Sequence, residues 1–130
     1  MAFNDPIAEF LTKIRNAQNA QHKHVDISIS KMKIQIANIM KENGFIENFI
    51  QNDSNKKMRV FLKYSKARKG IIKQLKRISK PGRRIYATSD KLPKIFGGIG
   101  VAVLSTSNGV MDDATARKLK VGGEVLCYIW

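Results

Sequence analysis

The chain has 130 residues, of which 43% are hydrophobic, and its 24 Lys and Arg against 10 Asp and Glu give a formal net charge of +14. This is enough apolar material for one ordinary domain or two small ones, which excludes a disordered polypeptide, and the charge indicates a polyanionic partner, either nucleic acid or an anionic membrane surface. We expect no membrane-spanning helix, which would need a run of roughly 20 apolar residues, and no secretory signal. The single cysteine, Cys127, excludes an internal disulfide framework and fits a reducing cytoplasm.

The excess of positive charge lies in the second half of the chain. Residues 1–64 carry 10 basic and 6 acidic side chains, whereas residues 65–130 carry 14 and 4, so the net charges of the halves are +4 and +10. Nine basic side chains fall between Lys66 and Arg84, where there is no acidic residue. Such a run is either a solvated face or a surface for a polyanion, and we favour the polyanion because most surfaces intersperse both signs.

The first predicted element is a helix that begins after Asp5. We expect Asp5 to be its N-cap and Pro6 its first residue, because apolar side chains then recur at helical spacing up to about Ala17. Residues 16–24 are polar and without period, which predicts a loop. Residues 25–29 alternate apolar and polar side chains, as is typical of a half-buried strand.

A second helix is predicted from Ser30, its N-cap, to Gly44, which would end it in a left-handed conformation. Lys31 and Lys33 lie in its first turn, where a cation opposes the helix dipole. This small local cost hints that both lysines contact an external anion.

Residues 45–50 and 58–64 are predicted to be two strands joined by a polar turn, which completes an α-β-α-β-β unit with both helices on one face of a small sheet. Residues 65–69 are polar and basic, and they form the best candidate for a linker. We therefore expect an α+β fold of two small subdomains, an α-β-α-β-β unit in residues 1–64 and a mostly β unit with one short helix in residues 65–130.

The second half begins with an ambiguous segment, because the apolar spacing of residues 71–78 slightly favours a helix over a strand. Pro81-Gly82 then predicts a type II turn, and residues 83–86 a short basic strand. Residues 90–93 are typical of a single helical turn, and residues 124–130 are rich in strand-forming side chains.

Residues 97–117, GGIGVAVLSTSNGVMDDATAR, form the part of the second half that the rest is expected to support. Glycines lead into a buried strand, which ends in three hydroxyl side chains and an Asn-Gly pair: Ser105, Thr106, Ser107, Asn108 and Gly109. The pair predicts a type I′ hairpin turn, because both central positions of that turn need a positive φ. Asp112 or Asp113 is expected to cap a short helix that ends at Leu119.

Two further strings accompany this stretch, Asn4-Asp5-Pro6-Ile7-Ala8 near the start and Gly122-Gly123-Glu124-Val125-Leu126-Cys127-Tyr128 near the end. Together with the pattern Gly100-x-x-Val103-Leu104-Ser105-Thr106-x-x-Gly109-Val110-Met111 and the later Ala116-Arg117, they resemble the bacterial form of the small-subunit ribosomal protein eight (S8) family. The resemblance covers the whole chain, and it implies a strand rather than a helix in residues 71–78.

The resemblance also implies a function. It predicts a constituent of the small ribosomal subunit that binds the central domain of the small-subunit rRNA directly and helps that domain to assemble. It implies contact with small-subunit ribosomal protein five and repression of the chain's own messenger through an RNA mimic of the rRNA site. We expect a cytoplasmic protein in the ribosome that is not an enzyme, needs no cofactor or metal, and binds neither membrane nor DNA.

The hydroxyl side chains suit hydrogen bonds to bases, sugars and phosphates, because no neighbouring histidine or carboxylate activates them for chemistry. Tyr86 is either a core residue or a ring for stacking on a base, and we favour stacking. By resemblance, Glu124 faces the RNA beside the hydroxyl loop, and cations of the first half touch a second rRNA segment. The predicted rRNA-binding residues are Ser105, Thr106, Ser107, Asn108, Tyr86, Glu124, Arg83, Arg84, Arg15, Lys31 and Lys57.

Three other functions fit the sequence less well. His22 and His24 could suggest a metal pair, but a metal site needs three or four ligands, and the sequence offers no Cys or His partner except the distant Cys127. A hydrolase or acyl transferase that uses Ser105 would need a base and a third group to orient it. A DNA-binding architectural protein shares the charge, but it would not depend on 2′-hydroxyl contacts.

Overall fold

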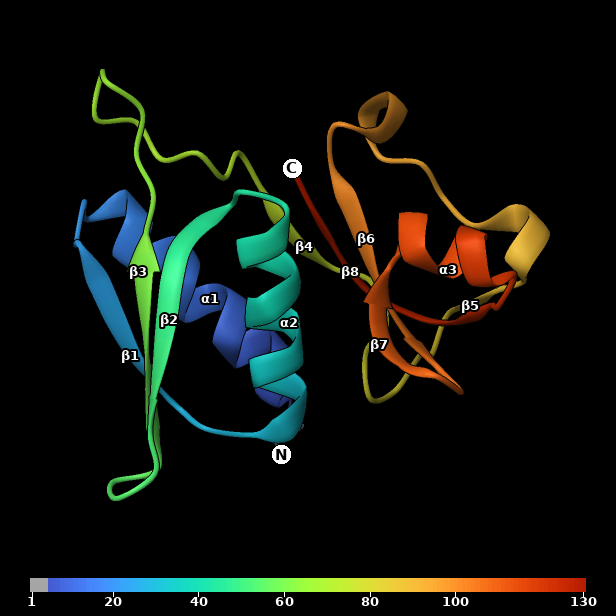
Figure 1. Ribbon diagram of the computed structural model, residues 1–130, viewed down its shortest axis with the longest axis horizontal. Helices are drawn as coiled ribbons and strands as arrows, with labels where there is room; N and C mark the ends of the chain where they lie inside the picture. Colours follow the sequence, from blue (N-terminus) through green and yellow to red (C-terminus); the bar gives the residue numbers. More distant parts are fainter. Residues whose placement is uncertain (1–4) are drawn as a thin grey trace.

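The computed structural model describes residues 5–130 and shows two antiparallel sheets with helices packed on them, which confirms the α+β class (Figure 1). Asn4, which contributes to the resemblance above, lies outside the described residues. The elements of the first half are α1 (Pro6–Asn19), β1 (His24–Ser28), α2 (Lys31–Glu42), β2 (Ile46–Asn52) and β3 (Lys57–Leu62).

Both predicted helix starts are confirmed. The Asp5 side chain accepts a hydrogen bond from the backbone N–H of Ala8, and the Ser30 hydroxyl accepts one from that of Lys33, at 3.2 Å in each case. Each cap satisfies one of the backbone donors that have no partner inside the helix. Helix α1 continues two residues beyond its predicted end, to Asn19, and the following loop is correspondingly shorter.

The first sheet has the order β1-β3-β2, and both helices cover the same face of it (Figure 1). Alternate strand residues point toward the helices, among them Ile27, Met58 and Val60, which are fully buried. Lys33 contradicts the sequence expectation. Only 4% of this residue is exposed, and its ammonium donates to the Ser28 hydroxyl at 2.9 Å, so it is a packing residue and not a free cation.

The second half forms the other sheet, of order β4-β8-β6-β7, with β5 paired to β8. Its elements are β4 (Leu75–Arg77), β5 (Tyr86–Ala87), the 3-10 turns η1 (Ser89–Lys91) and η2 (Phe96–Gly98), β6 (Val101–Thr106), β7 (Gly109–Asp112), α3 (Asp113–Leu119) and β8 (Gly123–Ile129). The segment at 71–78 is a strand, as the resemblance implied, although it pairs over only three residues.

Two predictions about the turn after β4 are wrong. The chain reverses at Pro81-Gly82, but Gly82 does not take the positive φ that a type II turn requires. The predicted strand 83–86 shrinks to β5, because Arg83 exchanges backbone hydrogen bonds with Lys80 and is unavailable to β8. The Ile85 N–H is also unavailable to β8, because it donates to the buried Ser79 hydroxyl at 2.7 Å.

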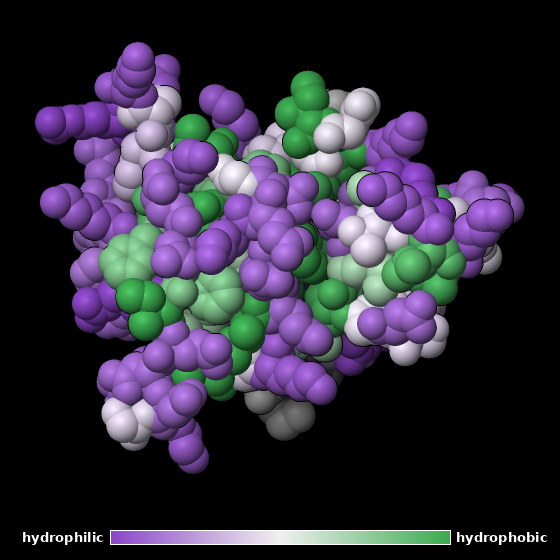
Figure 2. Space-filling model, viewed as in Figure 1, coloured by the Kyte–Doolittle hydropathy of each residue, from purple (hydrophilic) through white to green (hydrophobic). Residues whose placement is uncertain are grey.

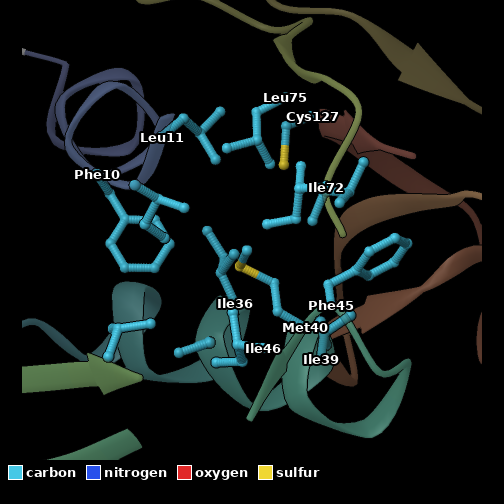
Figure 3. Packing of buried hydrophobic residues seen from close by; sticks show 14 of the residues in the cluster. Phe10, Leu11, Ile36, Ile39, Met40, Phe45, Ile46, Ile72, Leu75 and Cys127 are labelled. Carbon is cyan, nitrogen blue, oxygen red and sulfur yellow. The ribbon is translucent and has the colours of Figure 1, made fainter. Parts of the chain in front are cut away.

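The main hydrophobic core is shared by both halves of the chain (Figure 3). Phe10 and Leu11 from α1 and Met40 from α2 pack in one cluster with Leu75 and Cys127 from the second sheet. The second half has a small cluster of its own under α3, which consists of Leu104, Met111, Ala116 and Val125. The division of the chain into domains at residues 64 and 65 therefore stays a prediction. Within residues 5–130, no helix is long and apolar enough to cross a membrane.

Candidate nucleic-acid interface

The hairpin between β6 and β7 presents a tip of small polar side chains. Thr106 pairs with Gly109, so Ser107 and Asn108 form the two-residue loop. Gly109 has a φ of 110°, but Asn108 does not have a positive φ, so the predicted type I′ turn is wrong. The reason is the Thr106 hydroxyl, which accepts from the Asn108 N–H at 3.1 Å and donates to the Gly109 carbonyl at 2.8 Å. This local bonding fixes the turn without a left-handed residue at its centre.

The four polar residues of the hairpin therefore differ in what they offer to a ligand. Ser107 and Asn108 are exposed, and Ser105 is half-buried at the end of β6. Among the described residues, neither serine hydroxyl has a hydrogen-bond partner. The Thr106 hydroxyl uses its donor inside the turn, so it stabilises the tip, on which the Ser107 and Asn108 side chains are exposed.

A row of side chains crosses the sheet beside the hairpin. Ser105 on β6 lies opposite Glu124 on β8, which in turn lies opposite Tyr86 on β5. Residues directly opposite on antiparallel strands point to the same face. Tyr86 is 69% exposed, which excludes the core role that its sequence left open. The ring, the carboxylate and the hydroxyl thus lie in one row on the same face of the sheet.

Glu124 is not the isolated acid that its basic surroundings suggested. Its Oε2 accepts a hydrogen bond from Nη1 of Arg84 at 3.0 Å, and the Glu124 side chain is 16% exposed against 49% for Arg84. This hydrogen bond, together with the charge of the carboxylate, raises the pKa of the Arg84 guanidinium. The pair holds Arg84 beside Tyr86 with part of its guanidinium facing solvent.

Gly123 allows β8 to lie close to β6 at this row. A Cβ added to Gly123 would lie 2.2 Å from the carbonyl oxygen of Ser105, which is a backbone atom and cannot rotate away. The sequence showed the glycine pair at 122 and 123 but did not reveal why glycine is needed there. Close strand approach is a common reason for glycine inside a strand.

Two of the three predicted cations of the first half, Lys31 and Lys57, lie along the same edge of the molecule. Lys57 pairs with Ser28 at the end of β1, and the Ile29 N–H donates to the Lys56 carbonyl just before Lys31 begins α2. A cavity of about 250 Å³ separates the start of α2 from the turn that follows β4. It is lined by Asp5, Pro6, Ile7, Ser30, Met32, Lys33, Arg77, Pro81 and Arg84.

We call this margin the hairpin edge. It runs along the lower side of Figure 1, from the β2–β3 turn past the start of α2 to the β4–β5 loop and the β6–β7 hairpin. The β2–β3 turn, next to Lys57, lies at one end of this edge and the β6–β7 hairpin at the other (Figure 1). Ten of the predicted residues are distributed along it: Ser105, Thr106, Ser107, Asn108, Tyr86, Glu124, Arg83, Arg84, Lys31 and Lys57.

Arg15 lies elsewhere. Its guanidinium donates to the backbone carbonyl of Leu75, and Nε2 of Gln18 donates to that of Ile72 at 2.7 Å. These side chains of α1 bind backbone groups that precede and begin β4, so Arg15 has a structural partner and is not grouped with the hairpin edge.

An ion pair between a buried carboxylate and a half-buried arginine, which the sequence did not predict, anchors α3. Asp112 is the N-cap, and Asp113, which is 3% exposed, accepts from the Ala102 N–H and pairs with Arg117 at 2.7 Å. Arg117 also donates to the Pro93 carbonyl at 2.6 Å. The signal was present as an Asp and an Arg four residues apart on one helix.

The remaining candidates for chemistry have other roles. Burial raises the pKa of the Cys127 thiol to about 12, and its strand partner is Val103, so this cysteine belongs to the shared core. Within residues 5–130, no three His, Cys, Asp or Glu side chains come close enough to hold a metal ion.

The chain is similar to one family of proteins over almost its whole length. The model of the family described as "Ribosomal protein S8" matches residues 5–130. A protein of Caldicellulosiruptor bescii named "Small ribosomal subunit protein uS8" is 56% identical over 128 residues, which cover 97% of each chain. Proteins of the same name from Limosilactobacillus reuteri and Acholeplasma laidlawii are 52% and 50% identical, with 100% of each chain covered.

Proposed function

This chain belongs to the ribosomal protein S8 family, and on that basis we propose that it is a structural constituent of the small ribosomal subunit that binds small-subunit rRNA through the hairpin edge. The family is a structural one, and its members are named as ribosomal proteins, so we assign the chain no enzymatic activity. It would act in the cytoplasm, in the ribosome. Its rRNA target would be the central domain, which it would help to assemble.

The hairpin tip is suited to reading the shape of folded RNA. The Ser105 and Ser107 hydroxyls can each donate and accept a hydrogen bond, and the Asn108 amide adds two donors and an acceptor. These short side chains have few rotamers, and Thr106 fixes the turn that carries them. RNA offers base edges in distorted segments and 2′-hydroxyls along its shallow groove, both of which such groups can bond.

Tyr86 and Arg84 would contact the same RNA segment from the next strand. The exposed ring of Tyr86 offers a face for an unstacked base, and such stacking contributes about 1–3 kcal/mol per base. Glu124 would orient Arg84 toward a phosphate while accepting from a sugar hydroxyl or base amino group with its other oxygen. Its carboxylate would be tolerated near RNA because Arg84 compensates it.

The exposed cations of the edge would supply affinity without sequence information. Arg83, Lys31 and Lys57 have long side chains on the surface and flank the hairpin and the cavity between the halves. Contacts to phosphates position a protein on nucleic acid and make binding weaken as salt rises.

The observation that carries the proposal is the row of Ser105, Glu124 and Tyr86 beside a fixed hydroxyl tip in a chain of charge +14. Its test is equilibrium binding to a transcript of the rRNA central domain and to DNA of the same sequence. We expect binding to the DNA to be weaker by about two orders of magnitude or more, because several 2′-hydroxyl contacts of about 1 kcal/mol each would be lost. Equal binding to both would contradict the proposal.

Two finer roles follow from the resemblance and are proposals as well. The chain would contact small-subunit ribosomal protein five, and it would repress its own messenger through an RNA mimic of the rRNA site. If one surface serves both RNAs, the central-domain transcript must displace the messenger competitively. Simultaneous binding of the two RNAs would rule out repression through a mimic.

A further inference from the structure

We propose that the basic segment between the halves is a second RNA-binding surface that binds phosphates. It lies at the end of α1 that is far from the hairpin edge. We call it the linker surface, and it consists of Lys23, Lys63, Lys66, Arg68 and Lys69. The proposal rests on the proposed function, because it takes RNA to be the polyanion. Lys66, Arg68 and Lys69 belong to the basic run that the sequence assigned to a polyanion, but none of the five is among the residues predicted above to bind rRNA.

Hydrogen bonds gather these cations from three parts of the chain. The Leu62 N–H donates to the Lys23 carbonyl at 2.9 Å, and the Ile71 N–H donates to the Lys63 carbonyl at 3.1 Å. The linker itself is closed by Ser65, whose N–H donates to the Lys69 carbonyl at 2.8 Å. Backbone hydrogen bonds thus join the turn after α1, the end of β3 and the linker.

Two residues of these joined segments have an unusual backbone conformation. Gln21 and Arg68 have φ angles of 58° and 59°, and Nε2 of Gln21 donates to the Arg68 carbonyl at 3.3 Å. A positive φ is uncommon for residues other than glycine, and it is found where surrounding structure imposes it, often at binding sites. Here it lets the linker turn sharply while its three basic side chains, at 66, 68 and 69, stay exposed.

The charge of the linker surface is not compensated. Residues 18–24 and 63–76 contain no acidic residue, and within the described part of the chain none of the five cations is ion-paired with a carboxylate. By contrast, Arg84 on the hairpin edge is paired with Glu124. The linker, at the upper left of Figure 1, coincides with strongly hydrophilic side chains in Figure 2. Crowded cations without counter-charges favour an anionic partner.

The geometry separates this surface from the hairpin edge. Asp5 at the start of α1 is paired with Arg77 near the cavity of the hairpin edge, whereas beyond the other end of α1 Gln21 bonds to Arg68 of the linker. Helix α1 has 14 residues, and at about 1.5 Å per residue it spans about 20 Å. The two surfaces would therefore hold phosphates of different RNA segments, and the linker surface would do so without reading sequence.

The test compares two triple variants of the full chain that remove the same charge. The linker variant is Lys66→Gln, Arg68→Gln and Lys69→Gln, and the control is Lys91→Gln, Lys94→Gln and Lys118→Gln, all exposed positions. Dissociation constants for a small-subunit rRNA transcript are measured as potassium chloride is raised. We expect the linker variant to bind about tenfold more weakly or worse at 0.1 M salt, with a log–log salt slope shallower by roughly 2–3, because each phosphate contact contributes about 0.9 to that slope.

A second readout uses the unmodified chain. Lys66 and Lys69 should be protected from acetylation by excess rRNA transcript, while Lys91 and Lys118 should stay reactive.

Equal losses in the two triple variants, or unprotected Lys66 and Lys69, would overturn the proposal in favour of a general charge effect. A Ser105→Ala, Ser107→Ala variant in the same titration separates this failure from failure of the proposed function. If that variant loses affinity and the linker variant does not, the hairpin edge stands and the linker surface falls. If neither loses affinity, both proposals fall.

Discussion

The hairpin edge and the linker surface lie at opposite ends of α1 and are held in different ways. At the hairpin edge, backbone packs against backbone at Gly123, and a hydroxyl fixes the turn. At the linker, amide side chains of Gln18 and Gln21 hold the loop, and the cations project into solvent. Short polar side chains on a fixed backbone can therefore read a particular RNA shape, whereas long basic side chains on a loop can bind any phosphate nearby.

The largest expected effect comes from closing the gap between β8 and β6. Gly123→Ala places a Cβ 2.2 Å from the Ser105 carbonyl, so the two strands must separate. We expect the free energy of unfolding to fall by about 3 kcal/mol, the upper end of the usual cost of overpacking, together with a loss of RNA affinity. Urea unfolding and binding to an rRNA transcript measure both.

Two other glycines sharpen this prediction. Gly70→Ala, in the linker, places its Cβ 2.0 Å from the Gln18 side chain, which can rotate away and give up its bonds to Ile72, so we expect a cost of about 1 kcal/mol. Gly82→Ala meets no atom within 4 Å and should stay within about 0.5 kcal/mol of the natural chain. If Gly123→Ala were no worse than Gly82→Ala, the hairpin edge would not be rigid in the way described.

The second prediction separates shape reading from charge. The double variant Ser105→Ala, Ser107→Ala should weaken binding to rRNA by about 30-fold, since two hydrogen bonds contribute about 2 kcal/mol together. Its salt slope should match that of the natural chain because no cation is removed. A changed slope with unchanged affinity at low salt would reverse the roles assigned to the two surfaces.

The third prediction concerns the ring beside the tip. Tyr86→Leu keeps an apolar side chain but loses the aromatic face, so we expect binding to weaken about fivefold, or about 1 kcal/mol. Tyr86→Phe is the matched control and should bind within about twofold of the natural chain, provided that the ring stacks and its hydroxyl is not essential. Equal losses in both variants would instead indicate a hydrogen bond from the Tyr86 hydroxyl.

Local patterns in the sequence predicted the elements that local forces determine. The caps at Asp5 and Ser30 were found because a short polar side chain before an apolar period satisfies the first backbone donors of a helix, and Asp112 was one of two candidates for the third cap. The strand that leads to the hydroxyl tip was found from its apolar run. The α+β class followed from the order of these elements.

Long-range contacts explain what the sequence did not predict. Glu124 and Arg84 are 40 positions apart and meet only because β5 pairs with β8. Arg15 reaches a carbonyl 60 positions away, which spacing on α1 alone could not reveal. Lys33 is helical and basic like Lys31, but tertiary packing buries it beside Ser28. Periodicity predicts which side of an element is apolar, and it does not predict which polar groups will meet.

The smallest expected effect concerns Asp112, which joins the hairpin to the first half. Its side chain accepts from the Thr115 N–H at 2.8 Å and from the Asn43 amide of α2 at 3.2 Å. Burial by itself raises the pKa of the Asp112 carboxyl, but these hydrogen bonds and the Lys118 charge outweigh it and hold the pKa below the ordinary 3.8. A carboxyl with a lowered folded pKa stabilises the fold above its unfolded pKa and loses that contribution as pH falls through the folded value.

Acid should therefore loosen α3 and the hairpin while leaving the linker less affected. Asp112→Asn keeps an N-cap acceptor but cannot titrate, so the natural chain should lose a few tenths of a kcal/mol more than this variant between about pH 5 and pH 2, the solvent-exposed part of the carboxyl limiting the effect. Urea midpoints of the two proteins across that range measure the difference, and amide exchange in α3 and in residues 63–71 locates it. Parallel curves for the two proteins, or earlier exchange in the linker than in α3, would mean that Asp112 does not couple the hairpin to the rest of the fold.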